Sequence, residues 1–314
     1  MRNAFSDALV AAAMADPKVL LLTGDHGYAL FDPFRKARPE QYINCGIAEQ
    51  NMVGVAAGLA KAGFKPIVYG LAAFVPVRVL EQIKIDVCYE KLPVILIGDG
   101  AGLVYSHLGT SHQSTEDIAC TRAIPDLTVL SPSDRFEMTA TMELALTLNS
   151  PVYLRMGKSD RGDVHTKPLD LQAGEMVQIR QGKQRLALLA TGSMVKTALE
   201  LCDRGLDAEV WSVPCIKPLA RQQLADLVTR VDGLVTLEEH SIMGGLGACI
   251  AEKVAELRPL PIRRIGIQDR FSAYCGTWDY LLKEHQIDLL SVQKRVEDFV
   301  GTLPASSSAI SVTP

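Results

Sequence analysis

Glu49 is the residue whose type and surroundings are best suited to chemistry. It lies in the stretch G-I-A-E-Q-N-M, residues 46–52, between an apolar run with strand character and a helix-length segment rich in Ala and Gly. A carboxylate in this place can hydrogen-bond a ring nitrogen of a flat cofactor while the close-packed helix behind it excludes water. The same position also suits an ordinary first-turn carboxylate that the helix dipole stabilises. Glu49 alone leaves both interpretations open.

Two histidines lie in a glycine-rich stretch, G-D-G-A-G-L-V-Y-S-H-L-G-T-S-H-Q, which covers residues 98–113. His107 and His112 are five residues apart on a segment without periodicity, a spacing that matches no metal-ligand motif. Two histidines and several glycines in one loop are typical of a substrate-binding mouth. We expect the loop to follow a buried strand at 94–98, at the sheet edge where open α/β folds bind ligands.

Other polar and aromatic candidates follow neighbouring predicted strands and should reach the same edge. They are Asp25 and His26 after the strand at 19–23, Phe74 and Arg78 after the strand at 66–69, and Lys158 after the strand at 152–155. Asp25 equally suits the cap of a turn, and a lone Phe at this place is more often part of the core. The sequence indicates a candidate edge without fixing the role of each residue.

Apolar runs of strand length alternate with helix-length segments, a pattern that predicts parallel sheets with crossover helices. The first series predicts one doubly wound domain. Its strands are expected at 19–23, 41–44, 66–69, 94–98, 127–131 and 152–155, and its helices at 5–15, 48–62, 77–89, 115–121 and 134–147.

A polar stretch at 157–183 interrupts the pattern, with a short hairpin expected around Gln181–Lys183. A second, smaller α/β domain should follow. Its strands are expected at 185–190, 208–213, 233–238 and 261–267, and its helices at 193–204, 220–230 and 244–256. We therefore place the domains at 1–160 and 183–304, joined by a linker at 161–182, and expect the Ser- and Pro-rich tail at 305–314 to be disordered.

Composition excludes several classes of protein. The chain has 314 residues, is 48% hydrophobic and carries a formal net charge of −4, with no block of Lys and Arg of the kind that neutralises a phosphate backbone. No apolar run is long enough to cross a membrane. The seven cysteines are scattered and never spaced as C-x-x-C, which favours reduced thiols over disulfides or zinc. We expect a cytoplasmic protein that binds neither nucleic acid nor membranes.

Over nearly its whole length the chain resembles the C-terminal half of a transketolase, the small subunit of a split enzyme. The specific motifs are G-I-A-E-Q-N-M at 46–52, F-V-P-V-R-V-L-E-Q-I-K at 74–84 and T-S-H-Q-S-T-E-D-I-A at 110–119. The stretches A-T-G-S, I-K-P-L and G-G-L-G of the second half support family membership only. The resemblance implies a pyrimidine-binding domain, a transketolase C-terminal domain and transfer of a two-carbon ketol unit between sugars that are expected to be phosphorylated.

The resemblance also implies roles for single residues around thiamine diphosphate. Glu49 matches the Glu that binds N1′ of the aminopyrimidine and favours the tautomer that activates the thiazolium carbon, and Phe74 matches the ring that stacks on the pyrimidine. Asp25 aligns with an Asp near the thiazolium. His112 aligns with a catalytic His that faces the substrate, and Arg2 with an Arg that reaches the sugar phosphate.

Three positions depart from the family pattern in the substrate pocket. Lys158 stands where the family usually has the Arg of S-R-Q-N, which replaces a bidentate fork by a point charge. Ala29 replaces a phosphate-binding Ser, and Gly100 aligns with a substrate-facing His. A phosphorylated sugar remains the expected substrate, and these departures predict an atypical one.

The chain lacks a recognisable diphosphate site. Gly98-Asp99-Gly100 resembles the start of the family's metal and diphosphate motif, but residues 123–127 read A-I-P-D-L and lack the Asn pair that ends it. We therefore assign no metal ligand to this chain and expect Mg²⁺ and the diphosphate to be bound by a large subunit, in an α2β2 assembly. The helix at 48–62, with Gly54 and Gly58 spaced for close approach, suits the interface.

Two other functions stay open. The β subunit of a 2-oxoacid dehydrogenase E1, or half of a deoxyxylulose-phosphate synthase, has a similar pyrimidine domain and the same Glu, although the S-H-Q-S-T-E-D-I-A loop favours transketolase. A noncatalytic scaffold partner belongs to another class. The presence of both Glu49 and Phe74 argues against a scaffold.

Overall fold

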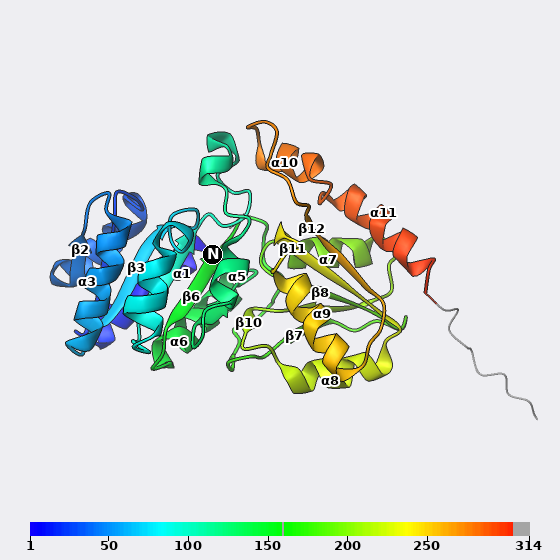
Figure 1. Cartoon of the computed structure of the whole chain (residues 1–314), viewed down its shortest axis with the longest axis horizontal. Coiled ribbons are helices and arrows are strands. Elements are labelled where there is room, and N and C mark those ends of the chain that lie inside the picture. The colour runs from blue at the N-terminus through cyan, green and yellow to red at the C-terminus, as the bar shows by residue number, and fades with distance from the viewer. Residues whose placement is uncertain (159, 304–314) are drawn as a thin grey trace, which may run out of the picture.

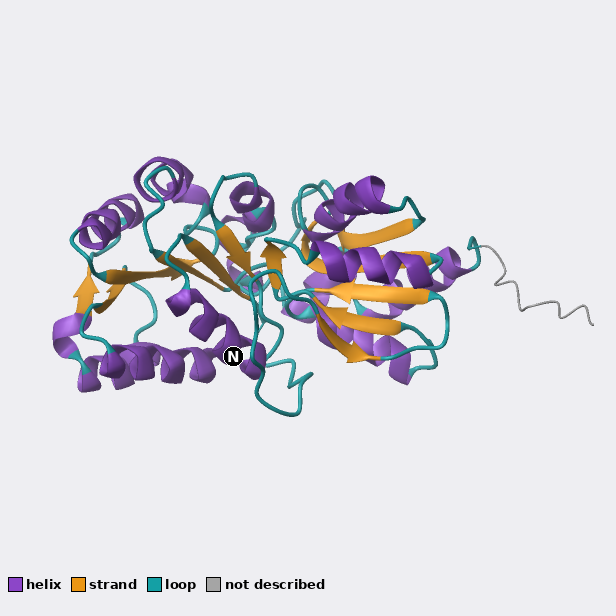
Figure 2. Ribbon diagram, turned by 90° about the horizontal axis from the view of Figure 1, so that it is seen from below, coloured by secondary structure: helices purple, strands orange, loops and turns teal. Residues whose placement is uncertain are grey.

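Two helix-covered sheets lie side by side in the chain (Figure 1). The structure is a computed structural model, and it describes residues 1–158 and 160–303. Figure 2 shows the strands of each sheet lying between helices, as expected when both faces of a parallel sheet are buried. No helix in these two ranges is long and apolar enough to cross a membrane.

The first sheet has seven strands in the order β10-β5-β6-β4-β3-β1-β2. Six of them come from the first half of the chain and run parallel to their neighbours. Because these six strands are parallel, their carboxyl ends meet at one edge. They are β1 (Val19–Thr23), β2 (Tyr42–Asn44), β3 (Lys65–Leu71), β4 (Ile95–Asp99), β5 (Thr128–Leu130) and β6 (Val152–Met156).

The helices of this half cover both faces of the sheet. Phe5 and Met138 belong to the apolar core that α1 and α6 bury on one face, and Met52 and Ile83 belong to the core under α3 and η4 on the other. The bounds are α1 (Arg2–Ala15), η1 (Ala29–Phe31), α2 (Asp32–Ala37), η2 (Pro39–Gln41), α3 (Glu49–Lys61), η3 (Val77–Val79), α4 (Leu80–Gln82), η4 (Ile83–Cys88), η5 (Ser106–Leu108), η6 (Thr110–His112), α5 (Asp117–Arg122) and α6 (Arg135–Thr147).

The second sheet has five strands in the order β12-β11-β8-β9-β7. Its strands are β7 (Val177–Arg180), β8 (Leu186–Ala190), β9 (Glu209–Ser212), β11 (Gly233–Ser241) and β12 (Ile262–Ile267). Its helices are α7 (Met194–Asp203), α8 (Arg221–Arg230), α9 (Leu246–Leu257), α10 (Trp278–Glu284) and α11 (Leu289–Val300). The α/β class and the order of a larger and a smaller unit agree with the expectation from the sequence.

Several local predictions were wrong. The hairpin around Gln181–Lys183 does not form, because β7 pairs with β9 and not with the following β8. The predicted linker thus contains an edge strand, whose half-exposed V-Q-I-R pattern is weak. The expected helix at 77–89 is divided into a 3₁₀ turn, a short α turn and a π turn. Helices α10 and α11 were not predicted, and the tail at 305–314 lies outside the described residues.

β10 (Cys215–Lys217) joins the two halves of the chain. It follows β9 of the second sheet but pairs antiparallel with β5 of the first. A buried ion pair lies at the same junction, where Arg155 Nε is 2.8 Å from Asp117 Oδ2 and Arg155 Nη2 donates to the Glu239 carbonyl oxygen at 2.7 Å. These side chains are at most 2% exposed, so the sheets share a desolvated polar contact.

Candidate active site

Four of the predicted site residues meet around the Phe74 ring. Phe74 and Arg78 follow β3, His112 lies in the loop after β4, and His26 follows β1. The Arg78 guanidinium lies 4.0 Å from the ring centroid. The His112 ring approaches edge-on with its centroid at 5.4 Å, and the His26 centroid is at 6.1 Å. Parallel strands thus gather residues separated by up to 86 positions, from His26 to His112, at one sheet edge.

Glu49 completes this cluster from the first turn of α3. Its side chain is only 6% exposed, and Arg78 Nη1 lies 3.4 Å from its Oε2. In the described chain this long contact is the one side-chain partner found for the Glu49 carboxylate, which can accept about four hydrogen bonds. A buried carboxylate with unused acceptor capacity beside an aromatic ring fits a flat, nitrogen-containing group.

Arg78 makes the same two kinds of contact that a flat, nitrogen-containing ligand would make here, one with the Phe74 ring and one with the Glu49 carboxylate. Its planar guanidinium lies against the Phe74 ring and directs an N–H toward Glu49. The Arg78 side chain is 48% exposed, so solvent weakens this ion pair. Glu49 and Phe74 therefore fit the aminopyrimidine of thiamine diphosphate. To bind against the Phe74 ring, the aminopyrimidine would have to lie beside the Arg78 guanidinium or displace it.

His112 is oriented by its neighbour. Ser111 Oγ lies 3.0 Å from His112 Nδ1, and the ring is half-buried against Phe74. This contact engages Nδ1, and among the described residues no hydrogen-bond partner is found for Nε2. The geometry suits a hydrogen bond to a substrate oxygen.

Arg2 lies in a second polar cluster, centred on Asp99. Arg2 Nη2 is 3.6 Å from Asp99 Oδ2, which also accepts hydrogen bonds from Tyr69 at 2.6 Å and Tyr105 at 3.1 Å. Burial disfavours the Arg2 cation, but Asp99, Tyr69 and Tyr105 together outweigh this effect and raise the pKa of Arg2. Sequence reasoning missed Asp99 as the partner of Arg2, although its place at the end of β4 was a signal.

Asp99 in the G-D-G stretch thus contacts protein side chains. Among the residues that the structure describes, no group of three or more His, Cys, Asp or Glu is arranged to bind a metal ion. Gly100 has φ +75°, and a Cβ on it would lie 1.9 Å from the Tyr105 ring. The Tyr105 ring therefore leaves no room for the His that the family has at this position.

The other predicted residues do not contact the Phe74 cluster. Asp25 is exposed and accepts a hydrogen bond from the Tyr28 hydroxyl. His107 is exposed on the loop after β4. Lys158 Nζ is 3.1 Å from Asp160 and 5.6 Å from the Trp278 ring centroid, so this residue faces the second half of the chain.

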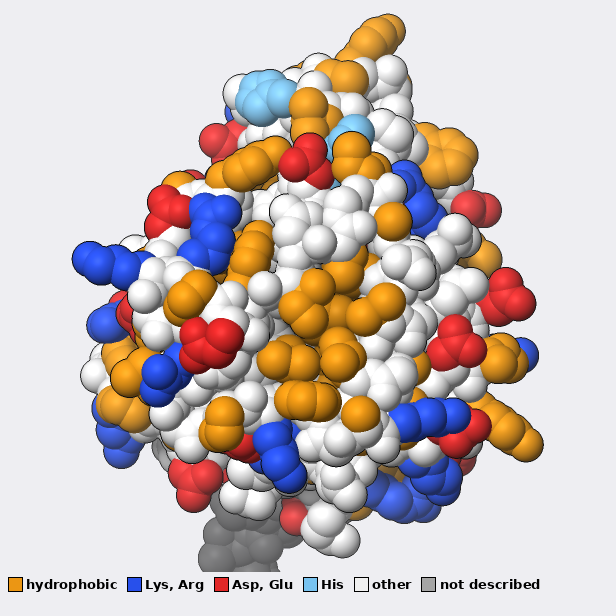
Figure 3. All heavy atoms as spheres, turned by 90° about the vertical axis from the view of Figure 1, so that its left-hand side faces the viewer, with side chains coloured by type: hydrophobic (Ala, Val, Ile, Leu, Met, Phe, Trp, Pro, Cys, Tyr) orange, Lys and Arg blue, Asp and Glu red, His pale blue; other side chains and the backbone are white. Residues whose placement is uncertain are grey.

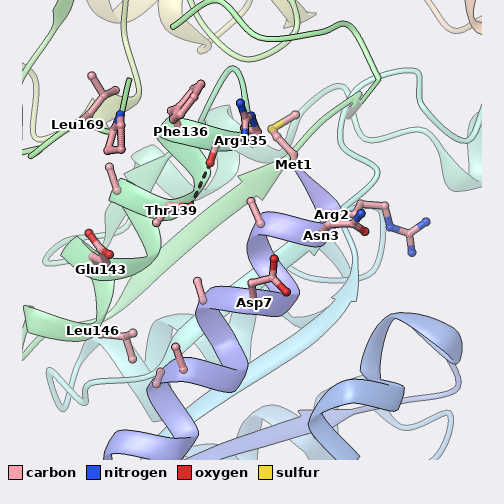
Figure 4. Close-up of a pocket in the computed structure, with 16 residues that line it drawn as sticks. Met1, Arg2, Asn3, Asp7, Arg135, Phe136, Thr139, Glu143, Leu146 and Leu169 are labelled. Carbon is pink, nitrogen blue, oxygen red and sulfur yellow. Dashed lines mark hydrogen bonds between the residues drawn. The ribbon is translucent and has the colours of Figure 1, made fainter. Parts of the chain in front are cut away.

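A hollow of about 980 Å³ lies between α1 and α6 (Figure 4). Arg2, Arg135 and Phe136 help to line it, while Glu49, Phe74 and His112 do not. In Figure 4 the Arg2 side chain extends away from those of Asp7 and Glu143. The predicted catalytic residues therefore lie outside this hollow.

An apolar surface lies at the α3 end of the molecule, which Figure 3 shows face-on. Exposed apolar side chains of this region include Ile47 and Val55 near and in α3, and Ile85 and Tyr89 in and after η4, with Ile47 77% exposed and Tyr89 81% exposed. A Cβ on Gly54 or Gly58 would meet nothing within 4 Å. Nothing in the described part of the chain requires glycine at these two positions.

Comparison with known proteins decides the family. Residues 1–162 match the family described as "Transketolase, pyrimidine binding domain", and residues 174–288 match "Transketolase, C-terminal domain". The chain belongs to the transketolase family. This membership implies dependence on thiamine diphosphate, a cofactor that Glu49 and Phe74 fit.

Relatives of similar length place this transketolase chain among small subunits of split enzymes. It is 32% identical to one of the subunits of an apulose-4-phosphate transketolase from Phocaeicola vulgatus, over 95% of this chain and 97% of the relative. It is 33% identical to the 6-deoxy-6-sulfo-D-fructose transketolase subunit SqwH of a Clostridium species, over 90% and 88% of the two chains. Subunits of this kind imply a large partner subunit.

Solved structures agree with this placement. A split-gene transketolase described as an inactive β4 tetramer superposes with a TM-score of 0.88 at 33% identity, covering 96% of this chain and 98% of that one. The transketolase of Leishmania mexicana shares the fold with a TM-score of 0.76 at 20% identity. This chain spans 46% of the length of the Leishmania protein.

Proposed function

We propose that this chain is the small subunit of a two-subunit transketolase that transfers a two-carbon ketol unit between phosphorylated sugars. The observation that carries the proposal is the cluster of Glu49, Phe74, Arg78 and His112 at the carboxyl edge of the first sheet. Similarity over at least 90% of this chain to subunits of two kinds of split transketolase supports it.

In this proposal Glu49 and Phe74 hold the aminopyrimidine of thiamine diphosphate. When bound, the cofactor supplies the electron sink for breaking and making a carbon–carbon bond beside a carbonyl group. Glu49 accepts a hydrogen bond from a protonated ring nitrogen, and its burial excludes water from that bond. Phe74 provides a flat apolar face. Asp25 lies near the same edge, where the family places an Asp beside the thiazolium.

His112 acts on the substrate. Its Nδ1 contact to Ser111 leaves Nε2 to hydrogen-bond a sugar hydroxyl or carbonyl oxygen and to exchange a proton with it. Substrate phosphate and hydroxyl groups meet the remaining polar residues of the sheet edge. We assign this role to Arg2, His26, Arg78, His107 and Lys158.

The large subunit supplies what the described residues of this chain lack. Mg²⁺ requires oxygen ligands and the diphosphate requires oriented N–H donors, and we assign both to the partner. The exposed residues Ile47, Val55, Ile85 and Tyr89 at the α3 end give an apolar contact surface, and the open faces of Gly54 and Gly58 allow close helix approach. An α2β2 assembly would place two such shared sites in one molecule.

Reconstitution with the large subunit tests the proposal. The complex with thiamine diphosphate and Mg²⁺ should release a ketol unit from xylulose 5-phosphate and pass it to an aldose phosphate, while pyruvate should give no product. Glu49→Gln in the same complex is the matched control, since it keeps the shape of the side chain. Equal turnover by this variant would favour the scaffold function.

A second candidate function rests on specific relatives. The 1-deoxy-D-xylulose-5-phosphate synthase of Caldanaerobacter subterraneus is 32% identical over 92% of this chain, which matches 47% of that enzyme. Consumption of pyruvate, without ketol transfer from xylulose 5-phosphate, would favour this function.

A further inference from the structure

The loop that carries His107 and His112 is closed at its base. Gly102 and Ser114 exchange two backbone hydrogen bonds, with N–O distances of 2.8 and 3.0 Å. Residues 103–113 therefore project as one unit, with His107 and Leu108 exposed and His112 against Phe74. Whatever fixes the base of this loop also fixes the position of His112.

Glu239, at the end of β11 in the second sheet, binds one side of this base. Its Oε1 accepts hydrogen bonds from the Leu103 N–H at 2.7 Å and the Trp278 Nε1–H at 3.1 Å, and its Oε2 accepts one from Ser193 Oγ at 2.6 Å. Glu239 is 2% exposed. Hydrogen bonds to a buried carboxyl group are among the stronger ones in proteins.

The approach of Glu239 explains the glycine at the start of the loop. Gly102 has φ +74°, and a Cβ on it would lie 2.5 Å from Glu239 Oε1. A larger residue would separate the carboxyl group from the Leu103 N–H. The loop sequence and the second domain are therefore fitted to each other at this point.

The second domain also binds the other side of the loop base. Ser272 Oγ donates to Gln113 Oε1 at 2.8 Å and lies 2.8 Å from His285 Nε2. The Ser241 N–H donates to the Thr115 carbonyl oxygen at 2.7 Å. Gln113 and His285 are both buried, so this contact is shielded from water.

We infer that Glu239 is a positioning residue for the proposed transketolase site, through which the second domain holds the 103–113 loop and so places His112 on the substrate. The inference rests on the proposed function for its catalytic consequence. It gives the second domain a role in the reaction although this domain contributes none of the residues around Phe74.

The test compares Glu239→Gln with Glu238→Gln. Glu238 is an equally buried neighbour, but its carboxyl group binds the Leu246 and Gly247 N–H groups within the second domain and does not touch the loop. Both changes place an amide where a carboxyl group was. Only the first weakens a hydrogen bond to residues 103–113.

Hydrogen exchange of the full chain is the first measurement. Glu239→Gln should speed exchange of the 103–113 amides about tenfold, because an amide oxygen accepts weaker hydrogen bonds from the Leu103 and Trp278 N–H groups than a carboxylate does, whereas Glu238→Gln should leave these amides unchanged. If Glu239→Gln fails to fold, Ser272→Ala must show faster exchange near Gln113. Unchanged exchange in Glu239→Gln, or in Ser272→Ala where that variant replaces it, would overturn the inference.

Kinetics of the reconstituted complex give the second measurement. Glu239→Gln should lower kcat/KM for the sugar about tenfold while the apparent affinity for thiamine diphosphate stays the same, since Glu49 and Phe74 are not on the loop. Equal losses of sugar and cofactor affinity would show a general structural defect and contradict positioning. If the complex had no transketolase activity at all, the proposed function would fail while the exchange result still decided whether Glu239 holds the loop.

Discussion

The carboxyl edges of the two sheets differ in how their acidic side chains are satisfied. At the first edge, the buried Glu49 has one long contact, at 3.4 Å, to a half-exposed Arg78. At the second edge, Glu238 and Glu239 are buried and bind N–H groups at 2.6–3.1 Å. Similar topology thus gives one edge with hydrogen-bonding capacity left for a ligand and one edge whose carboxyl groups are bound by the chain's own backbone and side-chain donors.

Unused hydrogen-bonding capacity identifies the functional edge better than its location at the carboxyl ends of strands does. Ligands of open α/β sheets bind at carboxyl ends of strands, and both sheets have such ends. In the second sheet the space is taken by the N-terminus of α9 and by the 103–113 loop of the first domain. The contrast predicts that substitutions at the first edge change activity more than stability, and that substitutions of buried groups between the sheets and at the second edge change stability.

Glu49→Gln should have the largest effect. We expect turnover of the reconstituted complex to fall on the order of 10²–10⁴-fold, the range for loss of an acid–base contribution. The free energy of unfolding of the isolated chain should change little, because Glu49 makes one weak ion pair. Steady-state rates and chemical denaturation measure the two quantities. A strongly destabilised variant would mean that Glu49 is structural.

Arg155→Met should have the next largest effect, on stability. It leaves Asp117, which is fully buried, without its ion partner, and breaking such a pair costs about 3–5 kcal/mol. Denaturant unfolding of the isolated chain measures the loss. The control is Arg180→Met, whose exposed pair with Asp203 should contribute at most about 1 kcal/mol. Equal losses in the two variants would contradict the buried junction between the sheets.

The filled edge should also depend on pH. Burial raises the pKa of Glu238 to about 7, although the Leu246 and Gly247 N–H groups act in the opposite direction. The folded state therefore binds a proton that the unfolded state releases above pH 4.5. Stability from this group should fall as pH rises from 4.5 to 7, by about 3 kcal/mol in total. Burial lowers the pKa of the neighbouring His240 to about 4, which has the opposite effect on stability over this range. The test is therefore the difference between Glu238→Gln and the unchanged chain at each pH. This difference should grow by about 3 kcal/mol in favour of the variant from pH 4.5 to 7, and a constant difference would refute the assignment.

Arg78→Ala, like Glu49→Gln, should change the free energy of unfolding by no more than about 1 kcal/mol, since the ion pair they share is half-exposed. Because Arg78 occupies the Phe74 face and points at Glu49, its removal tests whether it competes with the cofactor or assists it. We expect thiamine diphosphate to bind the reconstituted complex at least as tightly as before, by titration. A tenfold loss of cofactor affinity would show that Arg78 is itself a cofactor ligand.

The sequence predicted most elements of the first domain and the residues that follow its strands, because hydrophobic periodicity is a local property of the chain. Buried runs such as 19–23 and 152–155 became strands, and the motif around Glu49 became the start of a helix. It did not predict β10, whose three residues take their structure from pairing with β5 across the domain boundary. The edge strand β7 was also missed, since its exposed alternate residues weaken the apolar signal.

Contacts between distant segments could not be predicted. Nothing near Glu239 in sequence indicates the Leu103 N–H, which lies 136 residues away. Asp99 looked like part of a phosphate motif, and only the fold brings Arg2, Tyr69 and Tyr105 to it. Predicted site residues without a contact to the Phe74 cluster, such as Lys158 and His107, keep their proposed roles as predictions.

The most direct test of the shared site is calorimetric titration of thiamine diphosphate with Mg²⁺ into the isolated chain, the large subunit and their complex. We expect tight binding by the complex alone, because Glu49 and Phe74 hold the pyrimidine while the partner holds the diphosphate. Tight, Mg²⁺-dependent binding by the isolated chain would contradict this account.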